Sequence, residues 1–550
     1  MSLGRSPAQE DAFRSSTGFC RDRLSPTSIY ALLNRESHRL FPDDAFADLF
    51  CDIGRASVPP RITAVVMVLQ RLEGLSDREA VDRFSFDLRW KYAAGGLDFD
   101  HPGFVHTVLV DMRARLRRSE RPNRIFESAM EVARGAGLIG RKRVLDSTPL
   151  YDAVATQDTV TLIRSAIRAL LRVADEALQG ELRGVCKRDD DYVAPGKPAC
   201  DWDDAPAREA LIDALARDAY AILAALDGRK LSSEIKEAAQ LLATVVGQDL
   251  EQRDDGLFRI ARRVAKDRVI STVDPQTRHG HKTSARGFDG YKGHVAIDPD
   301  SEIITATEVT PGNAADGSVA EALLSDVLPS SMKDNTPAVT ETVTAAEAET
   351  VAVAAQDAVP PAPPARVEVF GDASYGTADL VEKIEAAGAE ANVKVQAPSA
   401  PAGHFGKDAF RIDLDAQTVT CPAGVTVQIR PISEGGGIAW FTSSCRECAL
   451  RLRCTDAKDG RGVRVHPKEA TLQRSRARQS SPMWKDHYRA TRPKIERKLA
   501  HLMFRRHGGR RARVRGCERT RHDFALLAAA HNLARLARLS VHFDGAVWAR

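Results

Sequence analysis

The first 130 residues carry apolar side chains at the spacing of amphipathic helices. The clearest case lies between Arg61 and Leu72, where the apolar residues are Ile62, Val65, Val66, Leu69 and Leu72. Gly74 is typical of a helix end, and the sequence Ser76-Asp-Arg-Glu79 has the form of a capping box that starts another helix. Two helices joined by a glycine turn form a candidate helix-turn-helix, with plain helical packing as the equal alternative. A basic amphipathic helix is predicted over 105–118.

Residues from about 156 to about 265 are predicted to form a second helical region. Their apolar residues fall into three stripes at helical spacing. The stripes are Val160, Ile163, Ile167, Leu170, Leu171, Ala174 and Leu178, then Leu211, Leu215, Ala219, Ile222 and Leu226, then Ile235, Ala239, Leu242 and Val246. We expect these residues to be buried core and to carry no chemistry.

Short apolar runs on either side of this region predict strands. The first strand covers 143–148. Strands at 290–297 and 302–309 are joined by the turn sequence Asp-Pro-Asp-Ser, which predicts a hairpin. A strand at 367–370, a helix over 377–387 and a strand at 393–396 follow.

Three segments differ from the rest in composition. Residues 331–366 are rich in Ala, Thr, Val, Glu and Pro, and are predicted to be a disordered linker. A cysteine-containing module is expected at 400–460. From Pro493 onward the chain is predicted to be mainly helical and basic.

The composition narrows the class of protein. A chain of 550 residues suggests about three or four folding units, and 43% hydrophobic with 28% charged residues is typical of a soluble globular protein. No apolar run of about 18 residues exists, so we expect no membrane span. The N-terminus lacks the apolar segment of a secretory signal, so a cytoplasmic location is expected. The sequence contains no glycine-rich nucleotide loop, so no nucleotide cofactor is expected.

The positive charge is concentrated near the C-terminus. The net charge is only +4, but residues 474–521 contain about 17 Lys or Arg against about three Asp or Glu. Such a block favours a polyanionic partner on one face of the protein. The alternative is a solvated helical surface without a partner.

Two aspartates are expected at the ends of apolar strands. Asp146 follows Val-Leu, and Asp372 follows Val-Phe-Gly. Carboxylates at a sheet edge are suitable ligands for Mg²⁺, and a pair of such ions can activate a water or a 3′-hydroxyl against a phosphodiester. A lone Asp after a strand is more often a turn or a helix cap, so the assignment depends on the surrounding pattern.

The surrounding pattern resembles the DDE transposases of bacterial insertion sequences. The motifs that carry the resemblance are Val-Leu-Asp146-Ser-Thr, Gly287-Phe-Asp-Gly-Tyr-Lys-Gly-His294, Thr310-Pro-Gly-Asn313 and Gly371-Asp372-Ala-Ser-Tyr-Gly376. The branch it resembles has a helical insertion after the first Asp and a Cys-rich module before the catalytic Glu. The resemblance covers about residues 45 to 540. It implies catalytic Asp146, Asp372 and a Glu, with Mg or Mn as the cofactor.

In this family the third acid lies in a helix with the pattern Tyr-x2-Arg-x3-Glu-x6-Lys. Tyr488, Arg492 and Glu496 match it with one extra residue between Tyr and Arg, so the resemblance implies that Glu496 is the third catalytic residue and metal ligand. The alternative is an ordinary solvated glutamate that pairs with a neighbouring Arg. Pro493 disfavours a helical conformation for the residue before it and suits the first turn of a helix. We therefore expect Glu496 in the first turn and Arg492 just outside the helix. The Lys position holds Met503, and the missing cation is expected from Arg497, Lys498, Arg505 or Arg506.

The resemblance also implies an α/β (mixed α+β) fold with a ribonuclease H-like core. The predicted core comprises 140–155, 266–330 and 367–398, and is completed by helical residues 485–540 that bear the Glu. The other parts are a helical N-terminal domain at 1–135 that is expected to bind DNA, the helical insertion at 156–265, the linker and the Cys-rich module.

The expected activity is metal-dependent cleavage and strand transfer at the ends of an insertion element. The expected partner is double-stranded DNA, both the terminal inverted repeats of the element and its target, bound by a homodimer. The residues expected to contact DNA are Tyr488, Arg492, Lys494, Lys498, Arg505, Arg506 and Lys292. For Tyr488 the equal alternative is packing. Two other functions remain open: a ribonuclease H-like nuclease that cuts without joining, and an inactive DNA-binding derivative.

Four of the nine cysteines cluster in the sequence. Cys421, Cys445, Cys448 and Cys454 can supply four thiolates to a structural Zn²⁺, although only one Cys-x-x-Cys pair is present. Free thiols and an iron–sulfur cluster are the alternatives. The remaining cysteines are expected to be free thiols in a reducing compartment.

Three histidines accompany basic residues near the predicted hairpin. His279 and His281 can share a strand face and bind a metal, but no third ligand is evident. The neighbours of these histidines and of His294 include Lys282, Arg286 and Lys292. A basic loop that faces DNA is therefore the preferred interpretation.

Overall fold

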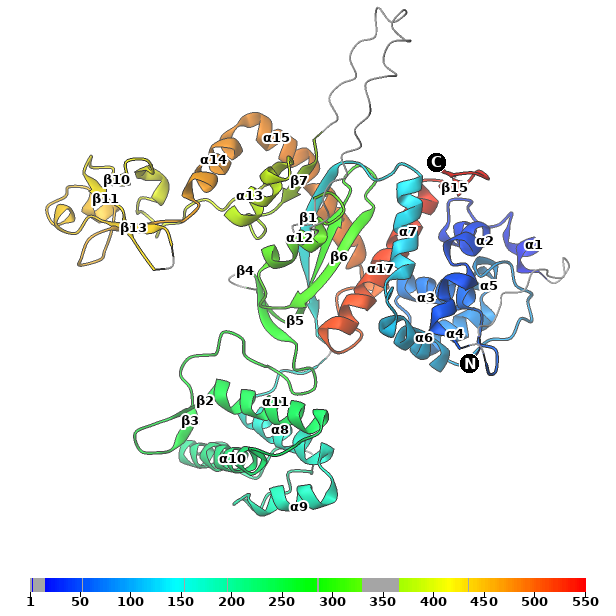
Figure 1. Cartoon of the computed structure of the whole chain (residues 1–550), viewed down its shortest axis with the longest axis horizontal. Helices are drawn as coiled ribbons and strands as arrows, with labels where there is room; N and C mark the ends of the chain where they lie inside the picture. Colours follow the sequence, from blue (N-terminus) through cyan, green and yellow to red (C-terminus); the bar gives the residue numbers. More distant parts are fainter. Residues whose placement is uncertain are drawn as a thin grey trace, which may run out of the picture.

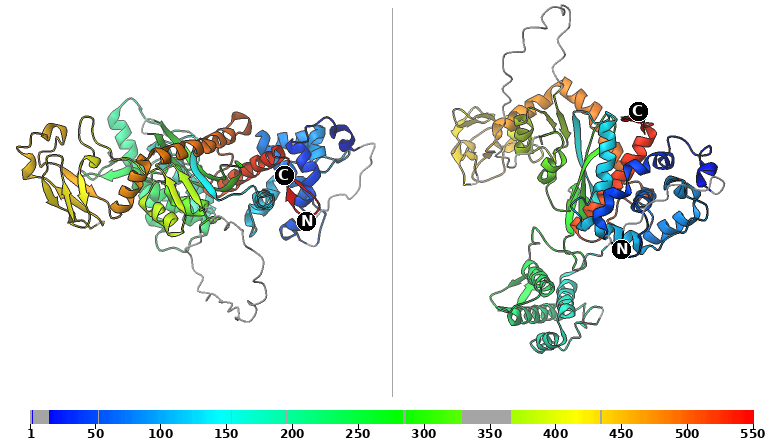
Figure 2. Two further views of the ribbon diagram at one scale, coloured as in Figure 1. Left: turned by 90° about the horizontal axis from the view of Figure 1, so that it is seen from above. Right: turned by 45° about the vertical axis from the view of Figure 1, so that its right-hand side comes forward.

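The structure is a computed structural model that describes residues 2, 15–51, 53–152, 154–194, 196–283, 286–328, 366–433 and 435–550. Apart from Arg366, the predicted linker at 331–366 lies outside the described residues. The N-terminal helices, the helical insertion and the cysteine module surround a central sheet, with the N-terminal helices and the cysteine module at opposite ends (Figures 1 and 2). Within the described chain, no helix has both the length and the apolar character needed to cross a membrane.

The N-terminal domain is helical, as predicted. The predicted helix end at Gly74 is observed, with φ 70° at that residue, and both hydrogen bonds of the capping box between Ser76 and Glu79 are present. The elements are α1 (Ser16–Cys20), α2 (Ile29–Leu40), η1 (Asp43–Leu49), α3 (Pro60–Glu73), α4 (Asp77–Phe86), α5 (Leu88–Ala93), α6 (Thr107–Arg118) and α7 (Arg124–Gly135).

The domain does not close its core alone. Helix α17 (Cys517–Arg538) runs between the N-terminal helices and the central sheet (Figure 1), and its buried Leu533 and Leu536 belong to the same apolar core as Leu69 and Met130. On its other side α17 supplies Phe524 to the core of the sheet. One long helix therefore fixes the N-terminal domain against the sheet.

The central sheet is mixed, with the strand order β6-β5-β1-β7-β8. Strand β5 is antiparallel to both β1 and β6, whereas β7 is parallel to β1 and β8 is parallel to β7. A further strand, β4, pairs with the first residues of β5. The strands are β1 (Lys142–Tyr151), β4 (Arg278–Thr283), β5 (Arg286–Ile297), β6 (Ile304–Pro311), β7 (Glu368–Gly371) and β8 (Glu390–Val393).

The predicted hairpin and the predicted strand before Asp372 are confirmed, but β8 is displaced. It covers Glu390–Val393 instead of 393–396, because its register with β7 aligns Glu390 with Glu368. Glutamate, alanine and asparagine are weak strand formers, so the start of this strand is not visible in the sequence.

Helices cover both faces of the sheet. Val144 points to one face, where α16 (Pro493–Leu502) and α17 pack, and Leu145 points to the other, where α12 (Ala320–Leu323) and α13 (Ala378–Ala386) pack. Asp146 is two residues after Val144 and therefore faces α16. The helices α14 (Glu469–Ser480) and α15 (Pro482–Thr491) connect the cysteine module to α16.

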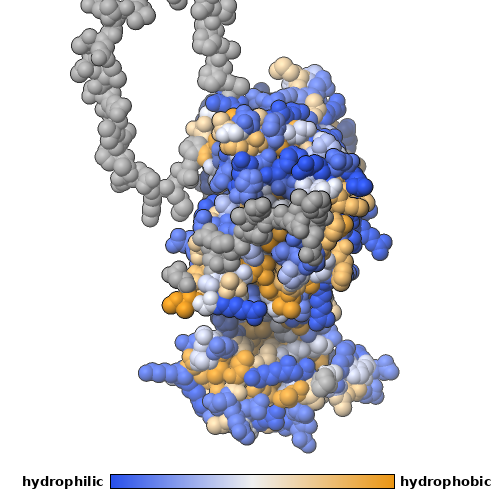
Figure 3. Space-filling view, turned by 90° about the vertical axis from the view of Figure 1, so that its right-hand side faces the viewer, coloured by the Kyte–Doolittle hydropathy of each residue, from blue (hydrophilic) through white to orange (hydrophobic). Residues whose placement is uncertain are grey.

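The helical insertion is a separate lobe (Figure 3), and two details of its prediction were wrong. The first stripe spans two helices, because α8 ends at Val173 and Leu178 lies on α9. Residues 250–260 form a hairpin around Gly256, whose φ is 74°, instead of continuing the helix. The elements are α8 (Thr159–Val173), α9 (Glu176–Gly184), α10 (Ala205–Leu226), α11 (Ser233–Asp249), β2 (Leu250–Gln252) and β3 (Phe258–Ile260).

The cysteine module consists of two small three-stranded sheets around Val419, Phe441 and Val463. Its last strand ends at Val465, five residues beyond the predicted boundary. The strands are β9 (Arg411–Asp413), β10 (Thr418–Thr420), β11 (Thr426–Gln428), β12 (Arg430–Pro431), β13 (Gly437–Trp440) and β14 (Gly462–Val465).

Candidate active site

The two candidate aspartates come from adjacent parallel strands. Asp372 directly follows β7, as predicted. Asp146 was expected at the end of its strand, but it lies in the middle of β1, where it pairs with Val295. The strand continues to Tyr151 because β5 extends beside it along that whole length. Asp146 therefore lies in strand backbone that pairs with β5 both before and after it in the sequence.

Arg492 connects the three candidate carboxylates. Its Nη2 atom lies 2.9 Å from Oδ2 of Asp146 and 3.9 Å from Oδ2 of Asp372. Its Nη1 atom lies 3.7 Å from Oε1 of Glu496. The structure thus brings together three acids that are separated by more than a hundred residues in the sequence, and it places one guanidinium among them.

The backbone of Arg492 differs from the prediction. Its φ of −59° and ψ of −39° are helical, and its N–H donates to the carbonyl oxygen of Tyr488. The steric preference imposed by Pro493 is overcome here by that hydrogen bond and by the ion pairs of the side chain. Helices α15 and α16 consequently follow each other directly through Arg492. The expected place of Glu496 in the first turn of α16 is confirmed.

Exposure increases across the three acids. The side chains of Asp146, Asp372 and Glu496 are 12%, 38% and 65% exposed. Burial raises the pKa of Asp146 to about 6, the negative charge of Asp372 raises it too, and Arg492 acts in the opposite direction. The ionised form of Asp146 is thus favoured by the neighbouring guanidinium of Arg492.

A cavity of about 660 Å³ contains all three acids and a fourth that the sequence interpretation missed. This fourth acid is Asp316, which accepts hydrogen bonds from Ser147 Oγ at 2.6 Å and from Lys292 Nζ at 2.8 Å. Lys292 is therefore oriented within the cavity by an ion pair. The position of Asp316, shortly after the Thr310-Pro-Gly-Asn313 motif, was the signal that could have found it.

Basic side chains surround the same cavity. Lys282, Arg286 and Arg510 are exposed and line it together with His281. Lys282 and Arg286, which were expected in a basic loop, lie instead on β4 and β5, beside the three acids. His279 instead pairs with Asp289 at 2.7 Å.

His294 is not part of the cavity. Its two ring nitrogens contact the Tyr375 hydroxyl and Thr310 Oγ1, each at 2.9 Å, and burial lowers its pKa to about 4. It is a neutral core histidine that ties β5 to β6 and to the segment after Asp372.

The other residues expected to contact DNA have varied surroundings. The Tyr488 hydroxyl donates to the Gly371 carbonyl at 3.1 Å, and its ring stacks on Trp484, so both the hydroxyl and the ring make contacts within the chain. Lys494 pairs with Asp300 at 3.1 Å. Arg505 and Arg506 are exposed and lie in η6 (Arg505–His507) beside the N-terminal domain.

The prediction that Lys498 contacts DNA is wrong. It is only 4% exposed, and burial lowers its pKa to about 8. A buried amine cannot reach a phosphate, because it lies on the face of α16 that packs into the core.

The chemistry of the donor set fits a hard divalent cation. Asp146, Asp372 and Glu496 offer carboxylate oxygens around a position where a positive charge, the guanidinium of Arg492, already lies. In the described residues, however, no three side chains of His, Cys, Asp or Glu are close enough to enclose one ion. The residues therefore suit Mg²⁺ or Mn²⁺ in kind, and Arg492 separates them.

The four clustered cysteines share one small cavity. Cys421, Cys445, Cys448 and Cys454 all line it, and burial raises the pKa of Cys454. They do not form a closed metal site among the described residues, and all nine cysteines of the chain carry free thiols. The cluster predicted from the spacing is present, whereas its zinc remains a prediction.

The fold brings two aspartates of a mixed sheet and a glutamate of α16 together in one cavity that basic side chains surround. Residues 21–115 match a model described as a transposase domain (DUF772), and residues 420–537 match the transposase DDE domain. No curated protein and no solved structure matches the chain. Both models describe transposase domains, so the matched segments support a DDE-type transposase of an insertion element.

Proposed function

We propose that this transposase cleaves DNA at the ends of its insertion element and transfers the cut strand into target DNA. The observation that carries the proposal is the contact of one guanidinium with Asp146, Asp372 and Glu496. These carboxylates belong to β1, to the residue after β7 and to α16, so only the folded chain unites them. The proposed catalytic residues are these three acids.

The strand order supports a ribonuclease H-like core. Three antiparallel strands, β6, β5 and β1, are followed by two parallel ones, β7 and β8, which is the sheet order of that fold. The first two acids then belong to the neighbouring central strands, and the third comes from a helix packed on the same face. This arrangement is the one that the sequence resemblance implies.

The role that we propose for each residue of the cavity is based on its burial, its charge and its contacts. Asp146, Asp372 and Glu496 would hold the metal, and Asp316 orients Lys292. Mg²⁺ or Mn²⁺ held there would supply Lewis-acid chemistry to the attacking and leaving oxygens. Lys282, Arg286 and Arg510 neutralise phosphates at the rim. Tyr488 positions Asp372 through its hydrogen bond to the preceding carbonyl.

The DNA partner and the oligomeric state are proposed from the resemblance to the transposase family. The DNA is double-stranded and comprises the terminal inverted repeats and the target. A homodimer holds the two element ends. A structural zinc ion in the cysteine cluster completes the assignment, because four cysteines line one cavity there.

The test uses purified full-length protein and a labelled double-stranded element end. With Mg²⁺ we expect a nick at the end of the element, followed by joining of the new 3′ end to a target plasmid. Cleavage without joining would support the nuclease alternative instead. Binding without either reaction would indicate an inactive derivative and would overturn the proposal.

A further inference from the structure

A second basic cavity lies away from the three acids. It has a volume of about 240 Å³ and is formed where α3, α4 and α6 of the N-terminal domain meet the start of α17. Its lining includes the arginines Arg71, Arg113, Arg117, Arg513 and Arg519 and the aspartates Asp77 and Asp523. An excess of guanidinium groups over carboxylates at the junction of two domains requires an explanation.

Each of the two aspartates pairs with one arginine of this set. Asp77 accepts hydrogen bonds from Gln70 at 2.6 Å and from Arg113 at 2.5 Å. Asp523 pairs with Arg71 at 3.1 Å. The lining therefore retains a positive excess from its remaining arginines.

The remaining arginines of the lining are Arg117, Arg513 and Arg519. Burial, with the positive charges of Arg519 and Arg113, lowers the pKa of Arg117. A nearby acid, Glu518, is 72% exposed and lies 3.8 Å from His522. Charges that repel one another in a partly buried hollow are stabilised by an anion.

A row of arginines joins this cavity to the candidate active site. From residue 511 to 515 exposed and shielded positions alternate, with Arg511, Arg513 and Arg515 exposed, Ala512 buried and Val514 half-buried. Arg510, just before this row, lines the cavity that holds the three acids.

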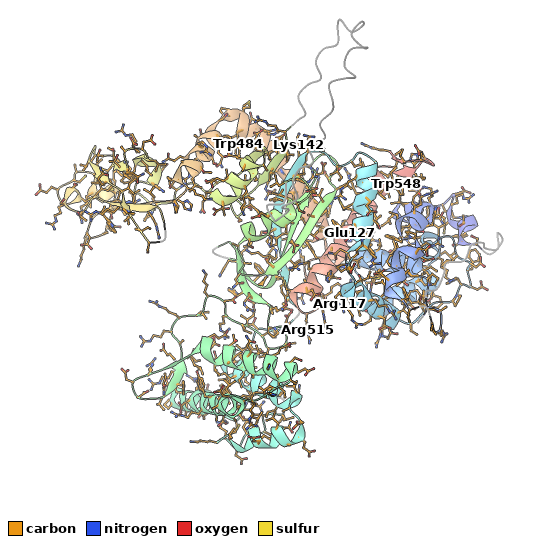
Figure 4. All side chains as sticks on the ribbon, viewed as in Figure 1. Arg117, Glu127, Lys142, Trp484, Arg515 and Trp548 are labelled. Carbon is orange, nitrogen blue, oxygen red and sulfur yellow. The ribbon has the colours of Figure 1, made fainter. Side chains whose placement is uncertain are left out.

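The backbone that carries the row is anchored at both ends. The N–H of Ala512 donates to the carbonyl of Tyr151 at 2.8 Å, and the N–H of Gly516 donates to Asp274 at 3.1 Å. Figure 4 shows Arg515 and Arg117 at the same end of α17. The arginines are thus presented from a fixed segment.

We infer that this row is a track for the DNA backbone, which runs from the candidate active site along Arg511, Arg513 and Arg515 to a phosphate held by Arg117 and Arg519. The inference rests on the proposed function and names the DNA contacts that position the element end. A small anion would be bound by the second cavity alone and would not need the row of arginines beside it. A row of arginines that ends in a guanidinium-lined hollow fits the repeated phosphates of a duplex, which Arg can bind bidentately.

The geometry predicts where these contacts fall on the DNA. Tyr151, which holds the arginine segment, is five residues along β1 from Asp146, or about 17 Å at the usual rise of a strand. A duplex rises about 3.4 Å per base pair. The arginine contacts should therefore lie about five base pairs or more from the bond that is cut.

The experiment compares Arg117→Gln/Arg519→Gln with wild type in DNA binding across a salt series. Each neutralised phosphate contributes about 0.9 to the slope of log affinity against log salt, so the double variant, which loses the phosphate held by both arginines, should have a slope smaller by about 0.9. The control is Arg172→Gln/Arg183→Gln, whose exposed arginines lie on the helical insertion. It should keep the wild-type slope.

Phosphate-ethylation interference gives a second readout. Wild type should show interference about five base pairs or more from the cut, and the double variant should lose it. If the first double variant does not fold, Arg511→Gln/Arg515→Gln replaces it in both measurements, because it changes only exposed residues of the row. An unchanged slope and footprint in a folded variant would overturn the track. Failure of wild type to bind any element end would instead overturn the proposed function.

Discussion

The Nη2 atom of Arg492 lies 2.9 Å from Oδ2 of Asp146, so the candidate active site contains a positive charge supplied by the chain itself. Asp372 and Glu496 lie within 4 Å of the same guanidinium. A divalent cation held by these carboxylates must displace or share that position. Arg492 is therefore a point at which metal binding can be tested separately from DNA cleavage.

Replacement of Arg492 by Gln should strengthen metal binding in the absence of DNA. Without the guanidinium, Asp146 and Asp372 retain their mutual repulsion, which a divalent cation relieves. We expect Mn²⁺ to bind about tenfold more tightly, equivalent to about 1.4 kcal/mol. Titration calorimetry measures this, with Arg489→Gln as the control, because Arg489 is 74% exposed and pairs with Asp486. Weaker binding by Arg492→Gln would refute the competition.

Glu496→Gln should remove cleavage while DNA binding is retained, because it removes one metal ligand and no positive charge. We expect a loss of at least about a hundredfold in the cleavage rate, or about 2.7 kcal/mol of barrier. Asp486→Asn is the matched control, since Asp486 is a nearby helical acid that is 78% exposed. If Asp486→Asn loses cleavage and Glu496→Gln does not, the third acid is wrongly assigned.

Lys498→Met should stabilise the protein at neutral pH. Burial lowers the pKa of Lys498 from 10.5 to about 8, so the unfolded state binds more protons between these values. The destabilisation is fully present below pH 8 and disappears as the pH rises toward 10.5. We expect the variant to gain on the order of 2 kcal/mol at pH 7. Its advantage should decline between pH 8 and 10.5.

Denaturant unfolding at several pH values provides this comparison. Lys494→Met is the control, because Lys494 lies on the same helix and its side chain is 31% exposed. A destabilised Lys498→Met protein at pH 7 would show that the ammonium group makes interactions that outweigh its burial.

Much of the fold followed from local patterns, and the errors have local causes. The Gly74 helix end and the capping box at Ser76 were predictable because each depends on a few adjacent residues. Strand β8 was displaced because its register is fixed by β7, which the local sequence does not reveal. The hairpin at 250–260 was missed, although it lies beyond the last apolar stripe and contains Gly256, whose φ is 74°.

The candidate site also combines residues that local motifs reveal with features that only the tertiary structure reveals. Asp146, Asp372 and Glu496 could be selected from motifs, but the place of Arg492 among them is a tertiary feature. Its helical backbone could not be foreseen, because the rule for a residue before proline is statistical and ion pairs overcame it here. Lys498 was misassigned because a basic block gives no indication of which side chains point inward.

The cysteine cluster should bind one zinc ion per chain. Four thiolates at about 2.3 Å from the metal are required for a structural site. Metal analysis of the purified protein should find zinc, and Cys448→Ser should lose most of it and lower the melting temperature. Cys200→Ser, which changes a half-buried cysteine of the helical insertion, should keep the metal. Absence of metal in the wild type would leave four free thiols.

The most direct test of the central claim is Mg²⁺-dependent cleavage of a labelled element end by Asp146→Asn, beside its DNA binding across a salt series. Asp146 offers a carboxylate to the metal and contacts Arg492, but it carries no positive charge for a phosphate. The account predicts that the variant binds DNA with the wild-type salt slope and does not cut. Cleavage by Asp146→Asn at the wild-type rate would contradict the account.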